Sequence, residues 1–99
     1  MNFSKNKLTT LPSISQPRLA RLLLNENEIA TCAAFLGHAN VQYLDLSKNK
    51  LTTVHGLSKM PRLQHLDMSE NEIVDLTGGL EKLVDLRKLI LTKNKIVSL

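Results

Sequence analysis

The sequence has few aromatic residues and almost no cysteine. Only 3% of its 99 residues are aromatic, there is no tryptophan, and Cys32 is the single cysteine. Large aromatic side chains usually supply much of the buried area of a small core, so we expect another packing scheme here. One cysteine cannot form an internal disulfide, which excludes a disulfide-stapled secreted scaffold.

Long apolar runs are missing as well. No stretch approaches the roughly 20 apolar residues that a membrane-spanning helix needs. The first residues also lack the apolar segment of a signal peptide. We therefore expect an intracellular, cytoplasmic protein without a membrane partner.

Leucine supplies what the aromatic residues do not, with 20 of the 99 positions, and its positions repeat. Four segments fit the template L-x-x-L-x-L-x-x-N-x-L, with Met68 at one leucine position: 19–29, 41–51, 63–73 and 86–96. The chain start carries a clipped copy, in which Phe3, Asn6 and Leu8 hold the last three positions. Successive template asparagines are 21, 22, 22 and 23 residues apart: Asn6, Asn27, Asn49, Asn71 and Asn94.

This template is the signature of leucine-rich repeats, and the sequence resembles that family over nearly its whole length. The alternating x-L-x-L stretch predicts short strands with one buried face, which must stack on their neighbours to form a core. The asparagine side chain can both donate and accept, so we expect it to satisfy backbone groups where the chain leaves the sheet. The resemblance implies an α/β fold, a right-handed solenoid with a parallel sheet on its concave face.

The segments between the strands indicate the subclass. After Asn49 an apolar residue falls at every third position, a period that suits 3₁₀ turns on the convex face better than a long α-helix. This resembles the 22-residue subclass found in phosphatase-1 regulatory subunits, axonemal dynein light chains and radial-spoke proteins. Segment 30–40 departs from the pattern, and we expect a different, more helical turn there. Cys32 lies on an apolar row, which predicts a buried structural thiol.

The repeats form one array over residues 1–99, with about five partial or complete repeats. Neither end shows the cap that shields the last apolar layer of a solenoid. We expect either a fragment of a longer array, which we favour, or an array completed by neighbouring chains.

Charges of alternating sign follow each other from repeat to repeat. Two columns lie just before and just after the template asparagines: Lys5, Glu26, Lys48, Glu70 and Lys93, and Lys7, Glu28, Lys50, Glu72 and Lys95. We expect neighbouring members to pair in solvent. Both outermost repeats present lysines, which disfavours head-to-tail self-association: Lys5 and Lys7 at one end, Lys93 and Lys95 at the other.

The strand positions that face away from the core form a grid on the concave side. Its candidate partner-binding residues are Arg21, Leu23, Tyr43, Asp45, His65, Asp67, Lys88 and Ile90. Asp45 and Asp67 are expected side by side, an unfavourable contact that Arg21, His65 and Lys88 could offset. Tyr43, Leu23 and Ile90 are candidate anchors for a protein partner, although singly exposed apolar residues are also ordinary surface.

Other chemistries find less support. Ser69, His65 and Asp67 share a strand face but point outward in parallel, whereas a catalytic triad needs its base turned toward the nucleophile. No tight ligand spacing for a metal and no cofactor motif occurs, so we expect no enzyme, no metal and no cofactor. The net charge of +4 could suggest nucleic acid, yet part of the excess is interleaved with acid and no aromatic stacking platform is present.

The sequence thus predicts a non-catalytic scaffold that binds a protein through the concave sheet face. Its alternatives are a structural subunit of a large assembly such as a ciliary axoneme, or a regulatory subunit of a protein phosphatase. A nucleic-acid-associated protein is the minority alternative.

Overall fold

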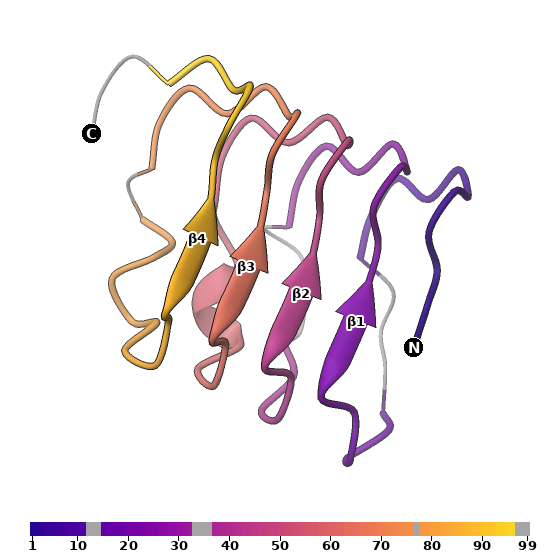
Figure 1. Cartoon of the computed structure of the whole chain (residues 1–99), viewed down its shortest axis with the longest axis vertical. Helices are drawn as coiled ribbons and strands as arrows, with labels where there is room; N and C mark the ends of the chain where they lie inside the picture. The colour runs from indigo at the N-terminus through magenta and orange to yellow at the C-terminus, as the bar shows by residue number, and fades with distance from the viewer. Residues whose placement is uncertain (12–14, 33–36, 77, 97–99) are drawn as a thin grey trace.

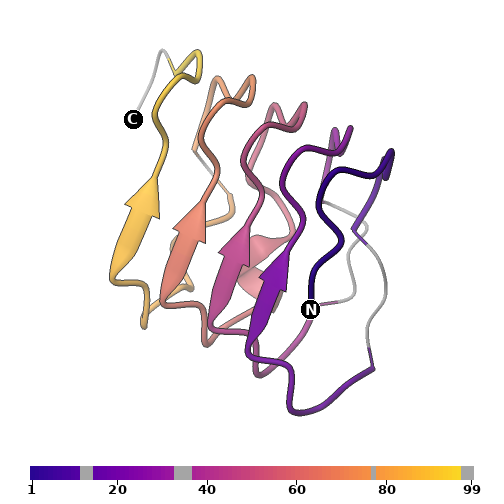
Figure 2. The same ribbon diagram turned by 45° about the vertical axis from the view of Figure 1, so that its right-hand side comes forward.

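The chain forms one parallel sheet. A computed structural model describes residues 1–11, 15–32, 37–76 and 78–96, in which four short strands lie side by side in the order of the sequence (Figure 1). They are β1 (Arg21–Leu23), β2 (Tyr43–Asp45), β3 (His65–Asp67) and β4 (Lys88–Ile90). The segments that return from one strand to the next lie behind the sheet as a second layer (Figure 2).

The first residues continue the ladder beyond β1. Asn2 forms a parallel bridge with Leu23, the Phe3 N–H donates to the Leu23 carbonyl (2.8 Å), and the Leu23 N–H donates to the Met1 carbonyl (3.0 Å). The clipped repeat at the chain start therefore packs as a partial repeat.

Leucine rows fill the space between the sheet and the return segments. The central strand residues are in register as Leu22, Leu44, Leu66 and Leu89, and the first three are almost fully buried. A single strand of this length cannot bury its own apolar face, so each repeat is stabilised by its neighbours. Among the described residues the buried core consists of aliphatic side chains, two methionines and Cys32, with Phe3 partly buried against it, as the packing scheme without large aromatic residues predicts.

The template asparagines tie adjacent repeats together. Asn49 is 7% exposed, and its Nδ2 donates to the carbonyls of Leu24 (3.0 Å), Leu46 (3.0 Å) and Ser47 (3.1 Å). Its Oδ1 accepts the N–H of Ile29 (3.0 Å), in the preceding repeat. The same pattern recurs at Asn71 and Asn94, so the predicted structural role is confirmed.

The return segments are built from tight turns. One 3₁₀ helix, η1 (Leu57–Lys59), lies within the described residues. Around it the period-three apolar residues are themselves linked, because the N–H of Leu57, Met60 and Leu63 donates to the carbonyl three residues earlier. The expected 3₁₀ character is confirmed in this segment.

Segment 30–40 can be judged only in part. Cys32 is 2% exposed and joins the core, as predicted. The helical turn expected there falls mainly on residues 33–36, which lie outside the described residues.

A backbone feature with no sequence signal accompanies every template asparagine. The residue before it is left-handed, with φ between 54° and 59°: Lys5, Glu26, Lys48, Glu70 and Lys93. Lysine and glutamate rarely adopt this conformation, so the turn, and not the residue's own preference, imposes it.

Candidate functional site

One face of the sheet carries all eight residues that the sequence predicts for partner binding. Each strand points its central leucine into the core and its two flanking side chains the other way, which leaves them exposed or half-buried. We call this the open sheet face. The first residues of the four strands form its first row: Arg21, Tyr43, His65 and Lys88. The third residues form its third row: Leu23, Asp45, Asp67 and Ile90. The second residue of each strand is the leucine that points into the core.

The first row is a stack of flat groups. The Tyr43 and His65 rings lie 4.2 Å apart between centroids, with an interplanar angle of 5°, and the Arg21 guanidinium carbon lies 4.4 Å from the Tyr43 centroid on the neighbouring strand. Stacking across strands holds Tyr43 between a cation and an imidazole. A side chain already held in place loses little entropy when it contacts a partner.

The third row brings two carboxylates together, as predicted. Asp45 and Asp67 are Cα partners on adjacent strands, and both are half-buried. The Ser47 N–H (2.9 Å) and hydroxyl (2.7 Å) donate to Asp45 Oδ1. Ser69 holds Asp67 in the same way, at 3.0 and 2.8 Å.

Arg21, His65 and Lys88 were named as residues that could offset the two carboxylates. Among the described residues none of them forms an ion pair with Asp45 or Asp67. Arg21 and His65 are engaged with Tyr43 instead. The serines two residues further on hydrogen-bond the aspartates instead. The Asp-x-Ser pattern at the ends of β2 and β3 is the sequence signal that could have revealed these bonds.

Two apolar side chains end the third row. Leu23 on β1 and Ile90 on β4 are half-buried and flank the aspartates. The row therefore reads apolar, acidic, acidic, apolar across the sheet.

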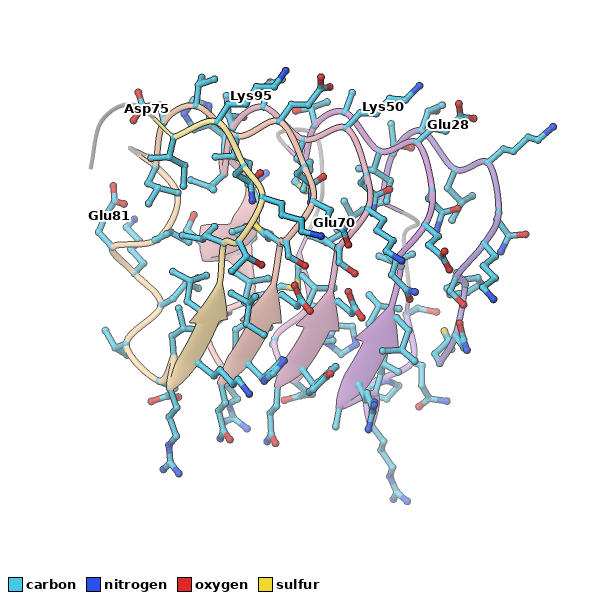
Figure 3. The ribbon with its side chains drawn as sticks, turned by 45° about the horizontal axis from the view of Figure 1, so that its top comes forward. Glu28, Lys50, Glu70, Asp75, Glu81 and Lys95 are labelled. Carbon is cyan, nitrogen blue, oxygen red and sulfur yellow. The ribbon has the colours of Figure 1, made fainter. Side chains whose placement is uncertain are left out.

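The charged columns run along the turns that follow the strands. Three pairs join adjacent repeats: Glu26 with Lys48 (3.9 Å), Glu28 with Lys50 (3.4 Å), and Glu72 with Lys95 (3.7 Å). Figure 3 shows Glu28, Lys50 and Lys95 along this edge. The predicted pairing is confirmed at these positions, and such exposed pairs contribute about 0–1 kcal/mol each.

The residue types of a hydrolase are present but are not arranged as one. The Ser69 hydroxyl donates to Asp67, while the His65 ring stacks on Tyr43. The three side chains therefore form no pair of nucleophile and base. Among the described residues no group of three or more His, Cys, Asp or Glu side chains is placed to hold a metal ion.

The single cysteine, Cys32, is buried in the core and lies away from this face. Burial raises the pKa of the Cys32 thiol from 9.0 to about 12, which keeps it protonated and unreactive at neutral pH. In the described part of the chain no helix is long and apolar enough to cross a membrane.

The repeats have known counterparts. A family model described as leucine rich repeat matches residues 17–73, a range that includes β1, β2 and β3. A comparison with curated proteins found no match. With more than half of its residues matched and a stacked parallel sheet built on the repeat, the chain belongs to the leucine-rich repeat family.

Proposed function

We propose that this protein is a non-catalytic scaffold that binds a protein partner through its open sheet face. Leucine-rich repeats are generally protein–protein interaction modules. The observation that carries the proposal is the stack of Arg21, Tyr43 and His65 on a face that nothing in the described chain covers. Rigid aromatic and arginine side chains are the residue types that dominate binding energies at interfaces.

The proposal includes the finer shape of the array. Parallel strands in sequence order, with bulkier return segments behind them, support a right-handed solenoid whose concave face is the open sheet face. A concave face surrounds a partner on more than one side, so contacts from all four strands can be used together.

The 22-residue subclass also belongs to this proposal. It is supported by the spacing of the template asparagines and by the turns linked every third residue around η1. Through its resemblance to phosphatase-1 regulatory subunits and axonemal proteins, the subclass favours an intracellular setting. The partner there would be a phosphatase or a ciliary assembly.

The test is affinity capture with quantitative mass spectrometry, comparing the wild type with Tyr43→Ala and Asp67→Ala. Both variants should recover at least tenfold less of the main partner. Val84→Ala is the control, because Val84 is 84% exposed on the return segment between β3 and β4. Recovery that is unchanged in both open-face variants would contradict the proposal, provided that amide NMR spectra show them folded.

A further inference from the structure

The third row of the open sheet face has a chemistry that selects its partner. We infer that it takes an extended protein segment carrying an arginine or lysine, with an aliphatic side chain two residues to either side. This inference rests on the proposed docking role, since both use the open sheet face.

The aspartates supply the charge argument. Each has one carboxylate oxygen held by its serine, while in the described chain Oδ2 of Asp45 and of Asp67 accepts no hydrogen bond. Two like charges opposite each other on adjacent strands repel, and partial burial strengthens the repulsion. A cation seated between them relieves it and finds two free oxygens as acceptors.

No cation of the described chain pairs with either aspartate. Arg21 lies over Tyr43 on the first row. Lys48, in the turn after β2, pairs with Glu26. Lys88 forms no ion pair with any residue that the structure describes, and it sits two residues away from the third row along β4.

The apolar ends set the spacing. Neighbouring strands lie about 4.8 Å apart, so the row from Leu23 to Ile90 spans about 14 Å. In an extended chain the residues i, i+2 and i+4 share one face and span about 13 Å. A segment that crosses the strands can therefore place aliphatic side chains near Leu23 and Ile90 and a basic one between Asp45 and Asp67.

The first row fixes which row the segment occupies. Arg21 and Lys88 stand at its two ends, so a basic segment shifted onto the first row would meet positive charge. The acidic third row attracts the basic segment and the basic ends of the first row repel it, so the segment is directed to the third row.

A display library of short random peptides, selected on the wild-type chain, tests the inference. Selected peptides should carry arginine or lysine flanked by aliphatic residues at the two stated positions. Asp45→Asn/Asp67→Asn should weaken their binding at least tenfold, because asparagine keeps the oxygen that Ser47 and Ser69 use but removes the charge. Citrulline in place of the peptide arginine should cause the same loss.

The matched control is Glu81→Gln/Asp85→Gln, which removes two exposed carboxylates from the return segment before β4. Its binding should stay within twofold of the wild type. An equal loss in this control would overturn the inference, since general attraction between charges would then explain the binding.

The other outcomes separate this inference from the docking role. Peptides that lose binding in Tyr43→Ala, yet have no basic residue and ignore the aspartates, overturn the inference and leave the docking role standing. Peptides indifferent to every open-face variant overturn both. Concentration-dependent NMR shifts of the Asp45 and Asp67 amides in the chain alone would show a second copy on this face, and would overturn the basic partner.

Discussion

At the scale of single residues, the template asparagines hold the array together more than their number suggests. Asn49 alone satisfies three carbonyls and one N–H from two repeats. These groups lie where the chain turns away from the sheet and loses its ladder partners. At Asn27, Asn49 and Asn71, which are buried, the side-chain amide satisfies backbone groups that have no ladder partner.

Asn49→Ala should lower the free energy of unfolding by about 3 kcal/mol, because removing the amide leaves several buried polar groups without partners at about 1–3 kcal/mol each. Urea unfolding measures the change. Asn25→Ala is the control, since Asn25 is half-buried and its side chain forms none of the ladder bonds. Equal effects in the two variants would contradict the role of the asparagine ladder.

Cys32 makes stability depend on alkaline pH. Its pKa is raised from 9.0 to about 12 in the folded chain. Below pH 9 the thiol keeps its proton in both the folded and the unfolded chain, so its full contribution to the free energy of unfolding is present. Between pH 9 and 12 only the unfolded thiol ionises, and stability is lost. The stability difference between the wild type and Cys32→Ala should therefore shrink by about 1 kcal/mol from pH 9 to 10. A difference that is constant over this range would contradict the burial of the thiol.

At the scale of elements, one return segment meets the next at a glycine. A Cβ added to Gly79 would lie 2.1 Å from the Val54 carbonyl oxygen, in the preceding return segment. The extra carbon would meet the Val54 backbone, which cannot swing away, and also the Val54 Cγ2 atom at 2.6 Å.

Gly79→Ala should destabilise the protein by about 2 kcal/mol or more, because overpacking against backbone forces the chain to shift. Gly78→Ala is the matched control. It has φ of +78° and faces only the flexible His55 ring at 3.0 Å, so we expect a cost of about 1 kcal/mol. Thermal or urea unfolding that ranks the two in the opposite order would contradict this packing.

Much of the element layout follows from the sequence. The template placed the strands near Leu22, Leu44, Leu66 and Leu89, and the register made Arg21, Tyr43 and His65 neighbours. Periodicity carries this information, because it reflects which side chains are buried.

Three details did not follow. The left-handed turn at Lys48 and its equivalents is imposed by the fold on residues with no preference for it. The face-to-face stacking of Tyr43 and His65 depends on side-chain rotamers, which no sequence spacing determines. The hydrogen bonds from serine to Asp45 and Asp67 are made within each turn. Charge alone pointed to basic residues on other strands as partners of these aspartates.

At the scale of the whole molecule, the alternating columns lead to a prediction about how two copies could meet end to end. Glutamate and lysine pair between adjacent repeats, but both end repeats present lysine. A second copy stacked head to tail would set Lys93 and Lys95 against Lys5 and Lys7 of the first.

Lys93→Glu/Lys95→Glu should therefore promote head-to-tail association, seen in sedimentation velocity as a sedimentation coefficient that rises with concentration. Arg62→Glu/Lys82→Glu carries the same change in net charge on exposed return segments and should remain as monomeric as the wild type. Association in both variants would attribute the effect to net charge alone, and association in neither would contradict the end-to-end repulsion.

The central claim is that the partner lies on the open sheet face, and site-specific photocrosslinking tests it most directly. A photoreactive amino acid is placed at Ile90, or at Val84 on the return segment, and irradiated with the captured partner present. We predict a crosslinked product from position 90 and none from position 84. A product from position 84 alone would place the partner on the return segments and contradict the claim.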